Sequence, residues 1–135
     1  MKKISCIILF NIIIFINSDL VTAQIIQYES YKKIVESSFG EPDTLYTQTN
    51  IILDLDRNQI SVISDNDTII HDILIEMEDD RTDYYFKTFQ VGDRNENDDE
   101  HSRFHFVGSR KDSEPEICIF EYRKLGGVNV YYVLE

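Results

Sequence analysis

After the first third of the chain, hydrophobic and polar residues alternate in short segments. In one of them Ile51, Leu53 and Leu55 occupy alternate positions, and Asp54 and Asp56 lie between them. A period of two places successive side chains on opposite faces of a β-strand. The pattern therefore predicts strands that turn one face toward a hydrophobic core.

Seven segments of this kind are bounded by Asp, Asn or Gly, which favour turns. They cover residues 50–56, 59–64, 68–78, 83–91, 102–108, 116–123 and 128–134. In the third segment Ile69, His71, Ile73, Ile75 and Met77 are expected to share one face. Seven strands joined by short turns predict a mainly β fold, an antiparallel meander. Alternation fits a small barrel and a sandwich equally well.

A different period precedes these strands. In residues 27–42, Tyr28, Tyr31, Val35 and Phe39 recur every three or four positions, before a Gly and a Pro that would end a helix. This spacing predicts one short N-terminal helix, with its aromatic stripe against the sheet.

The first 23 residues have the layout of a secretory signal peptide. A positive start is followed by about thirteen mostly apolar residues and by a polar stretch with small residues at Val21 and Ala23. Cleavage after Ala23 would leave residues 24–135, a length that suits a single small β-rich domain. We therefore expect an exported protein, either periplasmic or secreted.

Cysteine content and charge narrow the possible partners. Cys118 would be the only cysteine of the exported chain, so it forms no intrachain disulfide and is expected in the core.

Without Lys2, Lys3 and Asp19 the chain has 11 Lys and Arg against 24 Asp and Glu, a formal charge of −13. Such acidity argues against binding nucleic acid or anionic membranes, and permits cations or a basic protein. It also favours a soluble monomer.

The acidic stretch 91–101 is the most distinctive part of the sequence. Oxygen ligands of the kind that calcium prefers are offered by Asp93, Asn95, Asn97, Asp98 and Asp99. The spacing departs from a helix–loop–helix calcium loop, because Asp98 stands where Gly is needed and Phe104 where a bidentate Glu is needed. A solvated connection between two strands explains the same composition. The carboxylates of Asp93, Asp98, Asp99 and Glu100 would also suit a surface that contacts a basic partner.

Signals for catalysis are weak. The chain has no G-x-S-x-G motif, no phosphate-binding loop and no dinucleotide fingerprint. His71, His101 and His105 lack the spacing of a zinc site, and His71 is expected in or at the rim of the core with a hydrogen-bond partner. No catalytic or cofactor-binding residue is predicted.

The sequence thus favours a small exported binding or interaction module without catalysis, one that captures or inhibits a basic protein. One alternative is a calcium-dependent structural or ligand-binding β domain. The other is a small carboxylate-dependent hydrolase, which would need two facing acids in a cleft.

Overall fold

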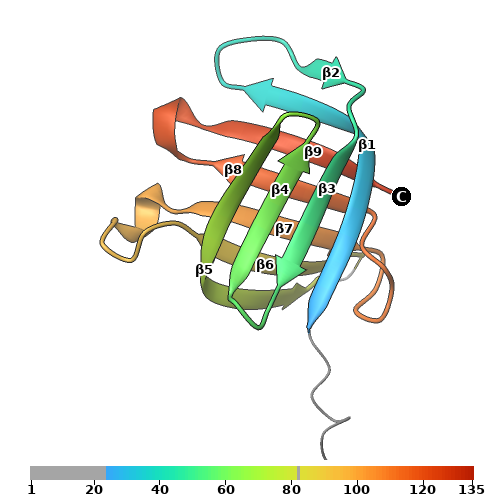
Figure 1. Cartoon of the computed structure of the whole chain (residues 1–135), viewed down its shortest axis with the longest axis vertical. Helices are drawn as coiled ribbons and strands as arrows, with labels where there is room; N and C mark the ends of the chain where they lie inside the picture. Colours follow the sequence, from blue (N-terminus) through green and yellow to red (C-terminus); the bar gives the residue numbers. More distant parts are fainter. Residues whose placement is uncertain (1–23, 82) are drawn as a thin grey trace, which may run out of the picture.

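The computed structural model describes residues 24–81 and 83–135, so the expected signal peptide, residues 1–23, lies outside the described part (Figure 1). Its elements in chain order are β1 (Ile25–Ser37), β2 (Asp43–Leu45), β3 (Thr49–Asp54), β4 (Gln59–Ser64), β5 (Asp67–Asp80), β6 (Tyr85–Val91), the 3-10 helix η1 (Asp98–Glu100), β7 (Ser102–Gly108), β8 (Ile117–Tyr122), the 3-10 helix η2 (Lys124–Gly126) and β9 (Val128–Leu134). Among these residues no helix has the length and hydrophobicity needed to cross a lipid bilayer.

The strands form a closed antiparallel barrel. From β3 to β9 each strand pairs with the next one along the chain, and β1 pairs with both β3 and β9. The short strand β2 adds to the outside of this ring by pairing with β1 alone. The predicted antiparallel meander is confirmed, and it closes as a barrel with all seven predicted strands in it.

The predicted N-terminal helix is wrong, because β1 occupies that segment. Tyr28 points inward and packs on Phe106, with 5.1 Å between ring centroids, whereas Tyr31 is 44% exposed and Phe39 is 89% exposed. The supposed stripe therefore does not share a face. A helix of about twelve residues is marginal by itself, whereas β1 in this place gains backbone pairing with strands on both sides.

Two bent strands turn the corners of the barrel. Tyr31 is an extra residue in the pairing of β1 with β9, and Leu74 is an extra residue in the pairing of β5 with β6. Such bulges bend a strand and re-aim its side chains. As Figure 1 shows, β3, β4 and the first halves of β1 and β5 run across the direction of β6 to β9 behind them. Each bent strand thus has one half in each layer.

The core lies between the two layers. Its fully buried side chains include Ile51, Ile60, Phe89, Phe104 and Cys118. Cys118 is therefore in the core, as the sequence predicts, and burial raises the pKa of its thiol.

The bulge in β5 corrects a second expectation. Ile73 packs against the core, but Ile75 and Met77 are 49% and 41% exposed. Beyond Leu74 it is Glu76 that stands opposite the buried Phe89. The apolar series in this strand is therefore divided between two faces, because one extra residue inverts the alternation.

Candidate functional site

The first half of β5 has an open edge. Residues 67–72 pair with β4 on one side, but pairing with β6 on the other side begins only at Ile73. On that second side one backbone hydrogen bond is made, from the amide of Gly92 to the carbonyl of Asp72, at 3.2 Å. Within residues 24–81 and 83–135 no strand pairs with this edge, which we call the β5 open edge (residues 67–72).

The direction of the backbone groups follows from the ladder. The amide of Ile73 donates to the carbonyl of Asn58 on the β4 side, at 2.8 Å. Backbone groups of successive residues in a strand face opposite sides. The N–H and C=O groups of Thr68 and Ile70 therefore face the open edge, where a further strand would find donors and acceptors at its usual spacing.

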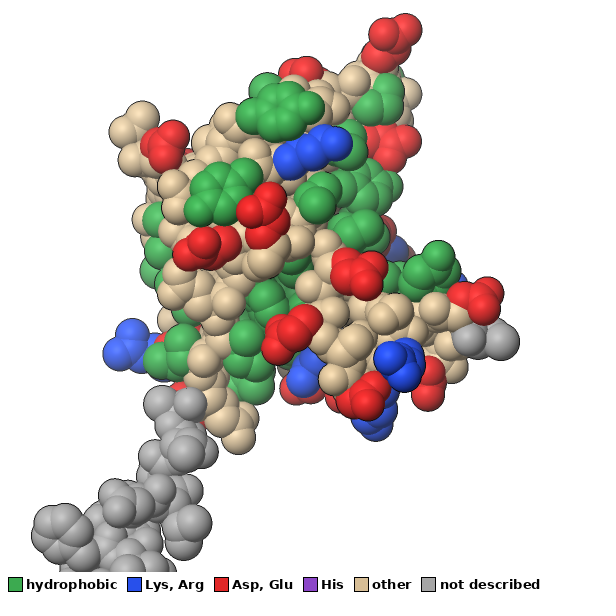
Figure 2. Space-filling view, turned by 90° about the vertical axis from the view of Figure 1, so that its right-hand side faces the viewer, with side chains coloured by type: hydrophobic (Ala, Val, Ile, Leu, Met, Phe, Trp, Pro, Cys, Tyr) green, Lys and Arg blue, Asp and Glu red, His purple; other side chains and the backbone are tan. Residues whose placement is uncertain are grey.

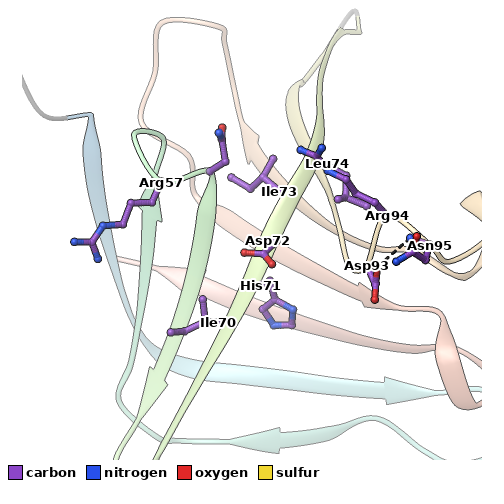
Figure 3. A pocket seen from close by; sticks show the side chains of 11 residues that line it. Arg57, Ile70, His71, Asp72, Ile73, Leu74, Asp93, Arg94 and Asn95 are labelled. Carbon is purple, nitrogen blue, oxygen red and sulfur yellow. Dashed lines mark hydrogen bonds between the residues drawn. The ribbon is translucent and has the colours of Figure 1, made fainter.

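Hydrophobic side chains and an open pocket accompany this edge. Ile69 and Ile70 are 49% and 58% exposed. A pocket of about 780 Å³ lies along the bend of β5, between this strand and the loop that contains Asp93, Arg94 and Asn95. Figure 3 shows the three loop residues beside β5. A chain that pairs with the edge would pass this pocket.

The loop is fixed at its base by His101, which is 4% exposed. Its Nε2 lies 2.8 Å from the carbonyl oxygen of Asp93, and its Nδ1 lies 2.5 Å from Nε2 of Gln90. Because a carbonyl only accepts, Nε2 carries the proton, and Nδ1 accepts from the Gln90 amide. Gly92 makes the exit from β6 possible, since its φ is +142° and a Cβ would approach Glu96 Oε2 to 3.1 Å.

The predicted acidic residues separate into two groups. Asp93 and Asn95 border the pocket, and Asp93 Oδ1 accepts a hydrogen bond from the Asn95 amide at 2.9 Å. The rest follow around η1, and they are Asn97, Asp98, Asp99 and Glu100. In the described part of the chain, no three His, Cys, Asp or Glu side chains form a group suited to a metal ion. Calcium binding by this loop stays a prediction.

Carboxylates without cationic partners flank the open edge. Asp65 and Asp67 lie at its start, and Asp72 and Asp93 lie at its end. Among the described side chains none of these four forms an ion pair with Lys or Arg. The carboxylate of Asp72 accepts a neutral hydrogen bond from Nε2 of the Gln59 side chain, at 3.1 Å. Negative charge therefore gathers at both ends of the edge, although Arg57 and Arg94 also border the pocket.

The second half of β5 differs in its electrostatics. Glu76 pairs with Lys87 at 2.9 Å, and Glu78 lies 3.5 Å from Lys111. These carboxylates are largely balanced by neighbouring cations. Elsewhere, on the face shown in Figure 2, carboxylates are scattered among hydrophobic side chains.

His71 lies between the pocket, which it lines, and the aromatic side chains of the core. Its ring lies 5.2 Å from that of Phe104 and 5.1 Å from that of Phe120, and burial lowers its pKa. It thus lies at the rim of the core, as expected, but its described contacts are with aromatic rings and the expected hydrogen-bond partner is not found among the described residues.

Sequence reasoning identified the acidic loop but missed the open edge. The edge arises from the register of three strands, and the only sequence signal for it is the unusual length of the apolar segment 68–78. No protein-family model matches the chain, and no curated protein or solved structure shows significant similarity to it.

Proposed function

We propose that this protein is an exported, non-catalytic binding module that captures an extended segment of a basic partner protein by adding it as a strand to the β5 open edge. The observation that carries the proposal is the set of backbone groups of Thr68 and Ile70 that face no strand, at an edge where Ile70 also borders a pocket. Strand addition uses such groups for affinity, and alternate side chains for specificity.

The surroundings of the edge select the partner's chemistry. Apolar side chains of the added segment would cover Ile69 and Ile70, which are half exposed. Lys or Arg at the ends of the segment would meet Asp67 and Asp93, and the negative charge of the whole chain would speed the encounter at low salt. The second half of β5 suits a cationic segment less well, because Lys87 and Lys111 already balance its carboxylates.

A synthetic peptide of alternating Lys and Val is a direct probe. We expect it to bind and to slow hydrogen exchange at the amides of Thr68 and Ile70, measured by NMR. A peptide with Glu in place of Lys should not bind. A Lys–Val peptide with alternate N-methylated amides should not bind either, because it lacks the donors that a strand requires.

Substitutions at position 70 distinguish the contribution of the backbone N–H to peptide binding from that of the side chain. Ile70→Pro removes an N–H that the ladder with β4 does not use, and Pro is accepted on edge strands. This variant should fold but lose the peptide, whereas Ile70→Val should retain both the fold and the binding. The proposal would be refuted if the peptide slowed amide hydrogen exchange at β2 only, or if the Lys and Glu peptides bound equally well.

A further inference from the structure

Arg103 and Glu121 are direct cross-strand neighbours on β7 and β8, yet they do not pair. The carboxylate of Glu121 instead accepts from Nε of Arg123 at 2.8 Å and from Nε2 of His105 at 3.2 Å. The Nε of Arg103 is buried, and no described protein group accepts its hydrogen bond. Among the described residues, the guanidinium of Arg103 thus has no carboxylate partner although Glu121 lies directly across the sheet from it.

An unpaired guanidinium N–H in such a position costs free energy, because it has lost water without gaining an acceptor. The buried Nε is itself out of reach of a ligand, but Arg103 is only partly buried and lines a groove, so an acceptor in that groove could be reached by the rest of its guanidinium. A planar guanidinium presents its donors as a fork that matches the two oxygens of a carboxylate or phosphate.

A groove on the outside of the barrel gives access to Arg103. It measures about 620 Å³ and crosses β5 to β9. Hydrophobic walls are provided by Met77, Phe86 and Ile119, and polar groups near Arg103 by Thr88, His105 and Asn129. The volume is in the range of small-molecule sites, and three hydrophobic side chains stand among polar and charged ones, so a ligand with both an apolar body and a polar group fits this lining.

Charges elsewhere in the groove are already compensated. Burial raises the pKa of Glu121, but its hydrogen bonds from Arg123 and His105 outweigh burial and lower the pKa. Asp79 pairs with Arg81 at 2.7 Å, and Glu78 lies beside Lys111. The uncompensated charge in the groove is therefore the positive charge of Arg103.

We propose that this groove binds a small molecule that carries an oxoanion group, a carboxylate or a phosphate, on a hydrophobic body. Arg103 holds the oxoanion, and Met77, Phe86 and Ile119 contact the body. The site lies outside the β5 open edge and does not depend on the partner proposed for that edge.

Isothermal titration at constant ionic strength tests this proposal with four probes: benzoate, phenyl phosphate, acetate and benzylammonium. Benzoate or phenyl phosphate should bind, and the stronger of the two identifies the preferred oxoanion. Acetate should bind about tenfold more weakly, since it lacks the ring that the apolar walls contact. Benzylammonium should not bind. Equal binding of benzylammonium and benzoate would overturn the proposal.

Two variants address the role of Arg103. Arg103→Met should abolish binding without lowering the Tm of the free protein, because it removes an unpaired charge. Arg123→Gln leaves Arg103 in place but releases Glu121 to pair with it, and should also weaken binding at least tenfold. Arg110→Gln, on an exposed loop, is the matched control and should bind as the parent does. If both Arg103→Met and Arg123→Gln bind benzoate and phenyl phosphate normally, the site is not at Arg103.

Discussion

Ile73 and Ile75 lie on opposite faces of β5, although residues two apart in an unbroken strand share a face. Leu74 is the extra residue that causes this inversion. Beside this bulge the pairing with β4 ends at Asp72 and the pairing with β6 starts at Ile73, which leaves residues 67–72 with an open edge.

Lysine at these two positions should have very different effects. Ile73→Lys places an ammonium against the core and is expected to lower the free energy of unfolding by about 2–4 kcal/mol. Ile75→Lys points to solvent and should change it by less than about 0.5 kcal/mol. Urea denaturation of both variants measures the difference. Equal losses would show that the alternation is unbroken.

The bulge in β1 has a hydrogen bond of its own. The hydroxyl of Ser30 is buried and donates to the carbonyl of Lys32, at 2.9 Å, across the extra residue. Ser30→Ala should lower the free energy of unfolding by about 1 kcal/mol. Ser61→Ala on β4, where the side chain is only half-buried, serves as the control and should be near neutral.

Cys118 should be inert in the folded protein. Burial raises the pKa of its thiol, so the reactive thiolate is scarce at neutral pH. Iodoacetamide should therefore label it only after urea has unfolded the chain, which mass spectrometry can follow. Labelling of the native protein at the rate of a free thiol would contradict the buried position of Cys118 in the barrel interior.

Glu121 should contribute to the loss of stability in acid. Burial raises its pKa, but hydrogen bonds from Arg123 and His105 outweigh burial and leave the pKa below the usual value of 4.5. Because the pKa is lower in the folded state, the stabilisation is present above pH 4.5 and is lost as the pH falls through the folded value. In Glu121→Gln, unfolding free energies at pH 7 and pH 3 should differ less than in the parent protein.

The acidic loop can be tested for calcium by thermal unfolding. If the loop is a partner surface, millimolar calcium and magnesium should raise the Tm equally and slightly, by screening charge. A rise with calcium alone would establish a site, since an ion that binds only the folded state stabilises it by about 2.7 kcal/mol at a hundredfold excess over Kd. Asp93→Asn should then remove that rise.

The strands were predictable because their alternation is local. The turn after Asp54 was equally readable, since Asn58 takes the left-handed φ of +53° that Asn tolerates. The strand β1 was not predictable from the sequence, because Tyr28, Tyr31 and Val35 satisfy a helical spacing. Ile25 and Ile26 in the same segment also suit a strand. Closure of the barrel by β9 decides between the two, and that pairing is not local.

The candidate sites were less accessible from sequence. Asp93 was identified because acidic residues crowd its loop. The open edge depends on which residues of β5 pair with which neighbour, and the unpaired state of Arg103 depends on Glu121 contacting Arg123 instead. Both features depend on the register in which the strands pair, and this register cannot be read from the composition of the chain.

The pairing of β1 with β9 also bears on how the chain folds. Ser30 lies opposite Leu134, so the first strand completes its hydrogen bonds only with the last one. Contacts between such distant residues slow folding, because the intervening chain must be ordered first. The ring therefore cannot close until β9 is available. A loss of the last strand should leave β1 with an unpaired edge and the barrel interior open to water.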